Sequence, residues 1–429
     1  MRVLITGADG FIGRHLVIAL LEAGYRVIGG VHNIEKVGIR MPAADYIPCD
    51  FMQDITPSDW LSRLRGVDAV INAAGMIRER RGQTFDRIHR DAPCALFDAC
   101  VAAGVKRVIQ ISALGADENA TSRFHRTKKE ADEYLARLDL DWVILYPSIV
   151  IGRGGRSTAL FSALAALPMV PIIGDGKQVI QPIHINDLTR VIVHLLKPDV
   201  RTRVRLCAVG PKPISMEVLL KSFRRWLGLR NTVEICIPIP AARAIAVLGD
   251  IVKMDLLHSE TLQMLLRGNT ATSTVFAEFV NTIGFEPEGI EQALARHPNA
   301  QADRWQARLY FLKPALRISV GLVWLTGGVT SLIYPRATTD QWLAAAGLTG
   351  SAASMMLYTA SILDIFLGIG TLSKFKIQLL GGIQIAVMAV YSIIIAVVLP
   401  EFWFHPFGPL VKNIPLAIAT LVMIALEEA

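Results

Sequence analysis

Charged side chains are scarce in the last part of this chain. Of its 429 residues, 52% are hydrophobic and 19% are charged. Polar and charged residues interrupt every apolar run before about Arg317, whereas charges almost vanish after it. The interior of a soluble protein holds only part of its apolar residues. This distribution therefore excludes an ordinary soluble enzyme and predicts that the last third of the chain lies in lipid.

Cysteine is also scarce, and no metal-binding pattern is present. The chain has five cysteines, an odd number without Cys-x-x-Cys spacing, so we expect reduced thiols in the core. They are Cys49, Cys94, Cys100, Cys207 and Cys236. His, Cys and carboxylate residues show no metal-ligand spacing, which predicts that the chain has no metal site.

Two further absences concern partners and targeting. The net charge is +7, but no basic stripe is interleaved with aromatic residues, which disfavours binding of nucleic acid. The first residues already have the pattern of a strand, so we expect no cleavable signal peptide before the fold.

Three glycines near the amino terminus are regularly spaced, three residues apart. Gly7, Gly10 and Gly13 follow the apolar run 2–6 and open the helical pattern 15–21. This spacing allows a tight turn, close approach of a pyrophosphate and close packing of helix on sheet, and the helix N-terminus offers N–H groups. The context predicts a dinucleotide-binding loop; the alternative is a tight turn without a ligand.

Short apolar strands and amphipathic helices alternate after this loop. We expect strands at 3–6, 26–31, 46–49, 69–72, 107–112 and 142–146, and helices ending near 23 or lying around 58–64, 94–103 and 123–138. This alternation is typical of an α/β fold with a doubly wound parallel sheet and helices on both faces.

Ligands of such sheets bind beyond the carboxyl ends of the strands. The residues expected at that edge are His32, Asn33, Glu35, Lys36, Asp50, Phe51, Asn72, Ala73, Ala74, Gly75, Ser112, Pro147 and Ser148.

Six motifs, in order along residues 1 to about 300, resemble the short-chain dehydrogenase/reductase superfamily in its extended or atypical branch. They are Thr-Gly-Ala-Asp-Gly-Phe-Ile-Gly at 6–13, Cys-Asp-Phe at 49–51, Asn-Ala-Ala-Gly at 72–75, Ile-Ser-Ala at 111–113, Tyr-Pro-Ser-Ile-Val-Ile-Gly at 146–152 and Pro-Ile-His-Ile-Asn-Asp-Leu at 182–188. The chain is most similar to the branch that includes the NADPH-binding accessory subunit of respiratory complex I.

The resemblance implies a cofactor site. The three glycines would hold the pyrophosphate, residues 50 and 51 would flank the adenine, and residues 72–75 would lie along the cofactor. The full expected set is Gly7, Asp9, Gly10, Phe11, Ile12, Gly13, His32, Asn33, Asp50, Phe51, Asn72, Ala73, Ala74, Gly75, Ser112, Lys128, Tyr146, Pro147, Ser148 and Ile149.

The end of the second strand bears on the choice of cofactor. An acidic residue there would bind a ribose 2′-hydroxyl and repel a 2′-phosphate, but His32 and Asn33 follow Val31, and Arg14 lies on the first helix. This favours NADP(H). Because Glu35 is close by, NAD(H) remains the alternative.

The family's proton-donating tyrosine is missing. The family uses a Tyr four residues before a Lys, together with a Ser after the fifth strand. Ser112 and Lys128 match this pattern, but Phe124 stands at the tyrosine position and has no proton to give. The cofactor is then structural or sensory, or His125, Thr127 or Ser112 replaces the donor, or the alignment is shifted.

For Lys128 the alternative is a surface lysine in a charged helix. For the alignment, Tyr134 lies on the wrong side of Lys128.

We expect an NAD(P)-binding domain at 1–305, with a smaller α/β lobe mainly at 198–302, and an all-α membrane domain at 306–429. In the smaller lobe, apolar residues at helical spacing are typical of core packing. They are Met216, Leu219, Leu220, Phe223 and Trp226.

Four apolar runs predict four transmembrane helices, at about 316–334, 355–372, 379–399 and 414–426, the last one short. A buried soluble bundle is the alternative. Lys and Arg flank the first span and the turn between the second and third spans. The positive-inside rule therefore predicts an inner-membrane protein whose amino-terminal domain faces the cytoplasm.

The last stretch resembles a DoxX-like four-helix module, notably in residues 406–415. This resemblance implies a link to quinone-dependent electron transfer. Asp364 and Gln384 lie within spans, where polar groups are costly, and Lys412 or Arg317 is a candidate partner for Asp364. Asp364 is either a site residue or a hydrogen-bonded group that joins helices.

Together these features predict a membrane-anchored, redox-linked NAD(P)H-binding protein. The alternative is an active NADPH-dependent reductase or epimerase acting on a membrane-soluble substrate such as a quinone or lipid.

Overall fold

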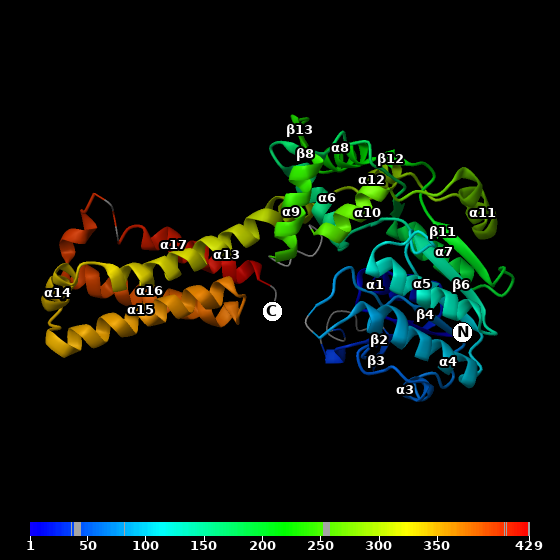
Figure 1. The fold of residues 1–429 in the computed structure, drawn as a ribbon, viewed down its shortest axis with the longest axis horizontal. Coiled ribbons are helices and arrows are strands. Elements are labelled where there is room, and N and C mark those ends of the chain that lie inside the picture. The colour runs from blue at the N-terminus through cyan, green and yellow to red at the C-terminus, as the bar shows by residue number, and fades with distance from the viewer. Residues whose placement is uncertain are drawn as a thin grey trace. The chain divides into compact units, whose positions relative to one another are not determined.

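The computed structural model describes residues 1–429 apart from 36, 38–43, 81, 252–257, 407, 409 and 428–429. The chain divides into two compact units, Met1–Ala307 and Arg308–Ala429, and each is described by itself (Figure 1).

A seven-stranded parallel sheet forms the centre of the first unit, in the order β11-β6-β5-β4-β1-β2-β3. Its strands are β1 (Arg2–Thr6), β2 (Arg26–Val31), β3 (Asp45–Pro48), β4 (Ala69–Asn72), β5 (Arg107–Ile111), β6 (Asp141–Pro147) and β11 (Val204–Ala208). The chain reverses its direction of winding between β1 and β4, where such sheets bind ligands. The prediction of a doubly wound α/β fold is confirmed.

Each face of the sheet has its own hydrophobic core, because successive side chains of a strand point to opposite faces. Val3 and Ile5 of β1 belong to one core, whereas Leu4 belongs to the other. The first core includes residues of α1 (Phe11–Glu22), α7 (Ile185–Leu195) and α11 (Ser273–Ile283). The second includes residues of α3 (Pro57–Leu61), α4 (Ala92–Ala103) and α5 (Arg123–Ala136).

The smaller lobe differs from its expected range of 198–302. Residues 204–208 pair with β6 as the edge strand of the main sheet, whereas earlier residues in α6 (Arg156–Ala166) and β8 (Val170–Ile173) join the smaller core with α8 (Met216–Trp226). A five-residue edge strand carries too little pattern to reveal which sheet it joins.

The first unit contains further helices and short strands. They are η1 (Asp86–Asp91), β7 (Val150–Ile151), β9 (Val179–Ile180), β10 (Ile183–His184), β12 (Ile214–Ser215), β13 (Glu234–Ile237), α9 (Ile239–Ile251), α10 (Ser259–Arg267) and α12 (Ile290–Arg296).

The expected core residues at 216, 219, 220 and 223 are buried. Of the cysteines, Cys236 is exposed, contrary to expectation, because β13 lies in a two-stranded sheet.

The second unit is helical. Among the residues that the structure describes, three helices are long and apolar enough to cross a membrane, namely α13 (Gln301–Ile333), α15 (Gly350–Leu372) and α16 (Ile377–Val398). The fourth expected span, α17 (Asn413–Leu426), has 14 residues and is shorter than the roughly 20 residues of a full span. Between them lie α14 (Arg336–Ala345) and the 3₁₀ turn η2 (Pro400–Trp403).

Glycines bring α13 and α15 into close contact. A Cβ atom on Gly368 would lie 2.6 Å from the backbone nitrogen of Leu325, and one on Gly328 would lie 2.6 Å from the carbonyl oxygen of Ser361. Close approach through small residues is the usual way in which membrane helices pack.

An ionic contact joins α13 to the segment after α17. Glu427 accepts a hydrogen bond of 3.3 Å from Arg317 and lies 3.7 Å from Lys313. The Arg317 side chain is only 10% exposed, so its charge is neutralised inside the bundle rather than by solvent.

Candidate functional site

The glycine loop after β1 lies against the end of β4. Gly7 has a φ of +65°, and a Cβ atom there would lie 2.8 Å from the Cα of Ala74. A Cβ atom on Gly13 would lie 2.1 Å from the carbonyl oxygen of Gly7. The loop therefore requires both glycines for its own packing.

Gly10 is the N-cap of α1, and its N–H donates to the carbonyl of Gly7 over 3.0 Å. The tip residues Asp9 and Gly10 are exposed. An α-helix begins with N–H groups that have no partner within the helix. Such groups at a helix start, together with the positive end of the helix dipole, are able to bind an anion.

Asn72 joins three strands at their carboxyl ends. Its Oδ1 accepts from the Thr6 hydroxyl over 2.6 Å, and its Nδ2 donates to Gln110 over 2.7 Å. The side chain is buried, so its hydrogen bonds fix the relative positions of these three strand ends. Beyond it, Ala73 and Ala74 are half-buried and Gly75 is exposed.

Ser112 and Lys128 come together behind this loop. The Ser112 hydroxyl donates to Asp132 over 2.5 Å, and Lys128 Nζ donates to the carbonyl of Ile111 over 3.0 Å. Both residues are buried, and Lys128 Nζ would lie 3.6 Å from a Cβ atom on Gly75. Lys128 is therefore not a surface lysine.

Burial controls the charges here. It lowers the pKa of Lys128 to about 8, although the Asp132 carboxylate opposes the shift. It also raises the pKa of Asp132 to about 6, against the hydrogen bond from Ser112 and the charge of Lys128. Asp132 was absent from the predicted site, although it lies four residues after Lys128 and hence on the same helix face.

The Phe124 ring lies in an aromatic cluster. Its centroid is 5.3 Å from that of His89, and 5.8 Å from Lys128 Nζ. His89 belongs to the π-helix η1, a rare element that often marks functional sites. Met76 N–H donates to its Nε2, which leaves Nδ1 to donate to Thr127. No sequence signal pointed to His89, because it belongs to none of the family motifs.

The residues that follow β2 and β3 lie at the β3 side of the sheet. His32 lies 3.9 Å from Asp50, with both side chains accessible to solvent. Glu35 is exposed, and Lys36 lies outside the described residues. Arg14 donates to the carbonyl of Gly154 over 2.8 Å, so it faces the loop after β7 rather than the end of β2.

Several expected contact residues lie in the protein core. Phe51 packs edge-to-face on Trp60, and Tyr146 is buried, with its hydroxyl 3.4 Å from Arg205. Pro147 is also buried, and the Ser148 hydroxyl donates to Asn269. Phe11, Ile12 and Ile149 are half-buried.

Buried histidines make stability depend on pH. Burial lowers the pKa values of His125 and His184 to about 4. In the unfolded chain each of these histidines binds a proton as the pH falls through about 6.5, whereas in the folded protein it does so only near pH 4. The free energy of unfolding therefore keeps the full contribution of these histidines above about pH 6.5. It declines as the pH falls towards 4, by roughly 3 kcal/mol per histidine. Asp132, with its raised pKa, opposes this trend more weakly.

We expect the midpoint temperature of thermal unfolding of the purified protein to decrease as the pH is lowered from 7 to 4.5. His184 Nδ1 accepts the N–H of Asn186 as the N-cap of α7. His184→Asn retains a capping acceptor without a titrating ring, and should make the decline shallower. An identical slope in both proteins would contradict this assignment.

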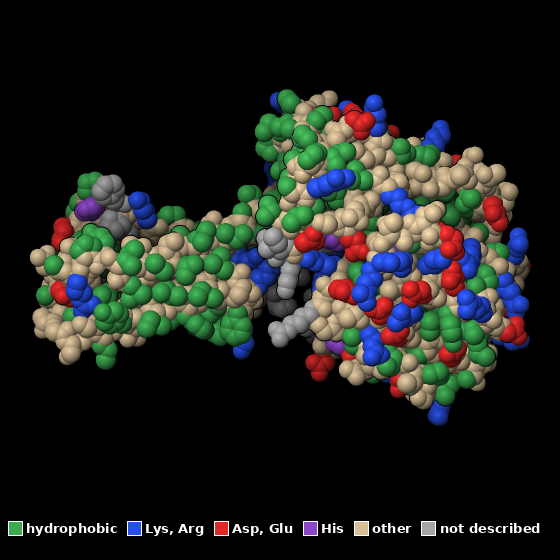
Figure 2. Space-filling model, in the orientation of Figure 1, with side chains coloured by type: hydrophobic (Ala, Val, Ile, Leu, Met, Phe, Trp, Pro, Cys, Tyr) green, Lys and Arg blue, Asp and Glu red, His purple; other side chains and the backbone are tan. Residues whose placement is uncertain are grey.

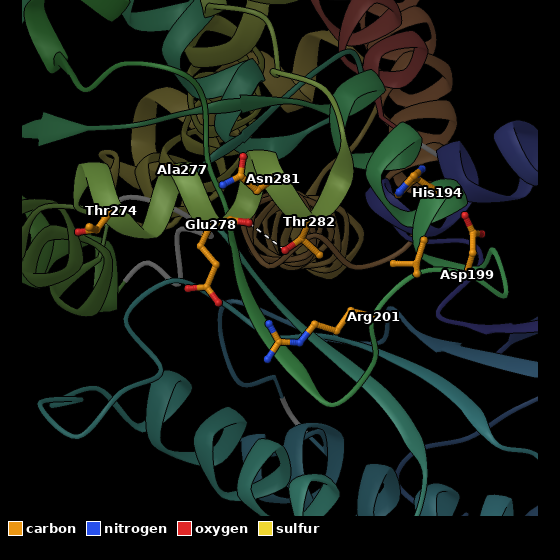
Figure 3. Close-up of a pocket in the computed structure, with 9 residues that line it drawn as sticks. His194, Asp199, Arg201, Thr274, Ala277, Glu278, Asn281 and Thr282 are labelled. Carbon is orange, nitrogen blue, oxygen red and sulfur yellow. Dashed lines mark hydrogen bonds between the residues drawn. The ribbon is translucent and has the colours of Figure 1, made fainter.

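A separate hollow of about 640 Å³ opens widely to solvent on the first unit (Figure 3). It is lined by His194, Asp199, Val200, Arg201, Thr274, Ala277, Glu278, Asn281 and Thr282. None of the expected site residues lines it, and Thr282 donates to the carbonyl of Glu278 within α11. Within the described parts of the chain, no three His, Cys, Asp or Glu residues converge as metal ligands.

Polar groups lie inside the helical unit. Gln384 is fully buried and donates to Thr371 over 2.8 Å, whereas the buried Oδ1 of Asp364 accepts no hydrogen bond from the residues that the structure describes. Lys412 is exposed at the start of α17, and Arg317 pairs with Glu427. In the motif at 406–415, residues 407 and 409 lie outside the described part.

Two protein families match this chain. Residues 7–162 match the family described as NAD(P)H-binding, and residues 321–421 match the DoxX-like family.

Curated relatives match about half of the chain. A ceramide reductase of Caulobacter vibrioides is 30% identical over 214 residues, which are 48% of this chain and 64% of that protein. Subunit 9 of the NADH dehydrogenase [ubiquinone] 1 alpha subcomplex of Arabidopsis thaliana is 27% identical over 56% of this chain and 61% of its own length. The chain thus spans less than two thirds of these relatives.

Among solved structures, MoeE5 in complex with UDP-glucuronic acid and NAD superposes with a TM-score of 0.53 at 22% identity, covering 69% of this chain and 97% of its own. This likeness shows the fold. The chain therefore combines a Rossmann-like domain that matches the NAD(P)H-binding family over residues 7–162 with a segment that matches the DoxX-like family over residues 321–421.

Proposed function

We propose that the amino-terminal domain binds NADP(H) at the carboxyl edge of its sheet and that the cofactor has a structural or sensory role. The glycine loop and the start of α1 would hold the pyrophosphate. Ser112 and Lys128 would lie at the nicotinamide end. His32 and Asn33, rather than an acid, directly follow β2 and favour a 2′-phosphate.

This proposal rests on the hydrogen bonds that the polar side chains near Phe124 already donate within the protein. Proton transfer requires a donor whose hydrogen can reach the substrate oxygen. The Ser112 hydroxyl donates to Asp132, and Thr127 donates to the backbone carbonyls of Arg123 and Phe124. Lys128 donates to a backbone carbonyl. The hydroxyl hydrogens of Ser112 and Thr127 are thus already used by the protein, and Lys128 uses one of its three, which supports binding without turnover.

The helical unit would anchor this domain in the inner membrane, with the domain on the cytoplasmic side. Lys313 and Arg317 on α13 and Lys374 and Lys376 between α15 and α16 supply the basic residues for this orientation. Gln384 and Asp364 supply hydrogen-bonding groups inside the bundle, which support a quinone or another membrane redox partner.

A reductase acting on a membrane-soluble substrate is the second candidate. It is favoured by the similarity to a protein named ceramide reductase and by the presence of Ser112 and Lys128. In this case His89 or Ser112 would have to release a hydrogen bond to deliver a proton.

Hydride transfer separates the two candidates. We expect the detergent-purified protein to bind NADPH more tightly than NADH, and to oxidise NADPH with a short-chain quinone no faster than buffer does. Phe124→Tyr adds a hydroxyl near Lys128, and we expect it to raise the single-turnover rate by about 10²-fold if a substrate carbonyl can enter.

Lys128→Met in the Phe124→Tyr protein is the matched control and should remove the gain. Mass spectrometry of small molecules that remain bound through purification would identify the cofactor directly. Rapid turnover by the unmodified protein would refute the non-catalytic role, and a preference for NADH would refute the NADP(H) assignment.

A further inference from the structure

Neighbouring elements of the first unit, β8, β13 and α9, expose large apolar side chains on or beside them. Figure 2 shows hydrophobic side chains gathered over β8, β13 and α9. We call this set the apolar patch, and its members are between 36% and 67% exposed: Met169, Val233, Ile235, Ile239, Ile245, Val247 and Leu248. Other exposed apolar residues, such as Leu61 on α3 and Val101 on α4, lie on separate helices. A patch of this kind marks an interaction surface.

Helix α9 has its large apolar residues outside and its small ones inside. Ala242 and Ala246 are buried against Leu262 of α10, with Ile173 and Ile237 packed beside them. Ile245 and Leu248, on the remaining faces, are about half-exposed. A helix of a soluble domain normally has the reverse pattern. Packing against the described residues of the first unit therefore does not account for these outward side chains.

The charged residues beside the apolar patch favour one kind of partner. Arg243 is the one charged residue between Ile235 and Gly249, and it is exposed. The neighbouring acids are engaged: Asp250 accepts hydrogen bonds from Ser259, and Glu234 lies 3.0 Å from Lys221. An apolar helix face with a cation beside it fits the interface of a bilayer that contains anionic lipid.

The anchor favours the same partner. Helix α13 begins at Gln301 within the first unit and continues to Ile333. Because both units belong to one chain, a bilayer that holds the helical unit is present at high effective concentration for the surfaces of the first unit. A second copy or another protein would have to be recruited from solution or from the membrane.

We infer that the apolar patch is a membrane-docking surface, with α9 lying in the lipid interface. The docked helix would also reach the cofactor crevice. Arg78, three residues after Gly75, donates to the carbonyls of Gly249 and Asp250 at the end of α9 over 3.3 and 2.9 Å. Docking of α9 thereby orders the loop that borders the cofactor.

A probe of depth in the bilayer tests this inference. The full chain with Cys236→Ser and Leu248→Cys would carry an environment-sensitive fluorophore at residue 248. It would be reconstituted as one copy per nanodisc in phosphatidylcholine and phosphatidylglycerol. We expect blue-shifted emission and at least twofold quenching by a nitroxide placed near the lipid head group, with little quenching by aqueous iodide. Val101→Cys on α4 is the matched control and should show the opposite pattern.

A second label at Val233→Cys tests the other end of the patch and serves if the first variant is unstable. Adding Arg243→Glu should weaken the lipid quenching, and more so in phosphatidylglycerol than in pure phosphatidylcholine. Equal iodide access at residues 248, 233 and 101 would overturn the inference. So would protection that appears only when two copies share a nanodisc, because the patch would then be a contact between chains. Neither readout depends on cofactor binding.

Discussion

Gly13→Ala is expected to remove measurable binding of nicotinamide cofactor and to destabilise the first unit by about 3 kcal/mol or more. The added Cβ would lie 2.1 Å from the carbonyl oxygen of Gly7 and 2.8 Å from the Cα of Ala8. All the obstructing atoms are backbone, so no side chain can rotate away. The helix must move away from the loop, and the pyrophosphate site is lost with it. Cofactor titration and thermal unfolding of the purified protein measure the two effects.

Gly327→Ala is the matched control, because it makes the same change inside a helix where a Cβ meets nothing within 4 Å. It should leave both cofactor affinity and the thermal midpoint unchanged. Gly10→Ala should give an intermediate effect, since its Cβ would lie 3.1 Å from the Gly7 oxygen. Full cofactor affinity in Gly13→Ala would show that the loop does not have the packing described above.

Gly368→Val should separate α13 from α15 and is expected to abolish the compact helical unit. Its Cβ would meet the backbone of Leu325 at 2.6 Å and the carbonyl of Gly321 at 2.9 Å. The helices would have to move apart by more than a side-chain adjustment allows, at a cost of roughly 3 kcal/mol before the lost contacts of Trp324 and Leu367 are counted. Size-exclusion chromatography and thermal aggregation in detergent report the result.

Gly382→Val on α16 is the control, because a Cβ at that position also meets nothing within 4 Å. It should remain monodisperse with a nearly unchanged midpoint. If both variants lost the compact state, a general effect of the β-branched side chain rather than the helix crossing would explain the loss.

Relations between residues close together in the sequence were sufficient to predict the glycine loop and the strands beside it. The spacing of Gly7, Gly10 and Gly13 has few conformational solutions, and the apolar run at 26–31 was too short and too β-branched for a helix. Its boundaries agree with β2. The replacement of the family's tyrosine by Phe124 could also be read from the sequence, because its four-residue spacing from Lys128 is a property of one helix.

Longer-range relations could not be predicted in this way. β11 pairs with β6 across about 60 residues, and His89 meets Phe124 through a π-helix that no propensity indicates. Helix α9 reads as an ordinary amphipathic segment until its buried residues prove to be alanines. Arg14 lies on the expected helix, but its guanidinium turns to Gly154, and this orientation depends on a loop 140 residues away.

The pairing of Arg317 with Glu427 also has a consequence for biosynthesis. The two residues are 110 positions apart, so a ribosome working at about 5–20 residues per second needs roughly 5–20 s to supply the acid after the base. During that interval the first apolar helix carries a guanidinium without its carboxylate. The contact between α13 and the segment after α17 therefore forms only after Glu427 has left the exit tunnel.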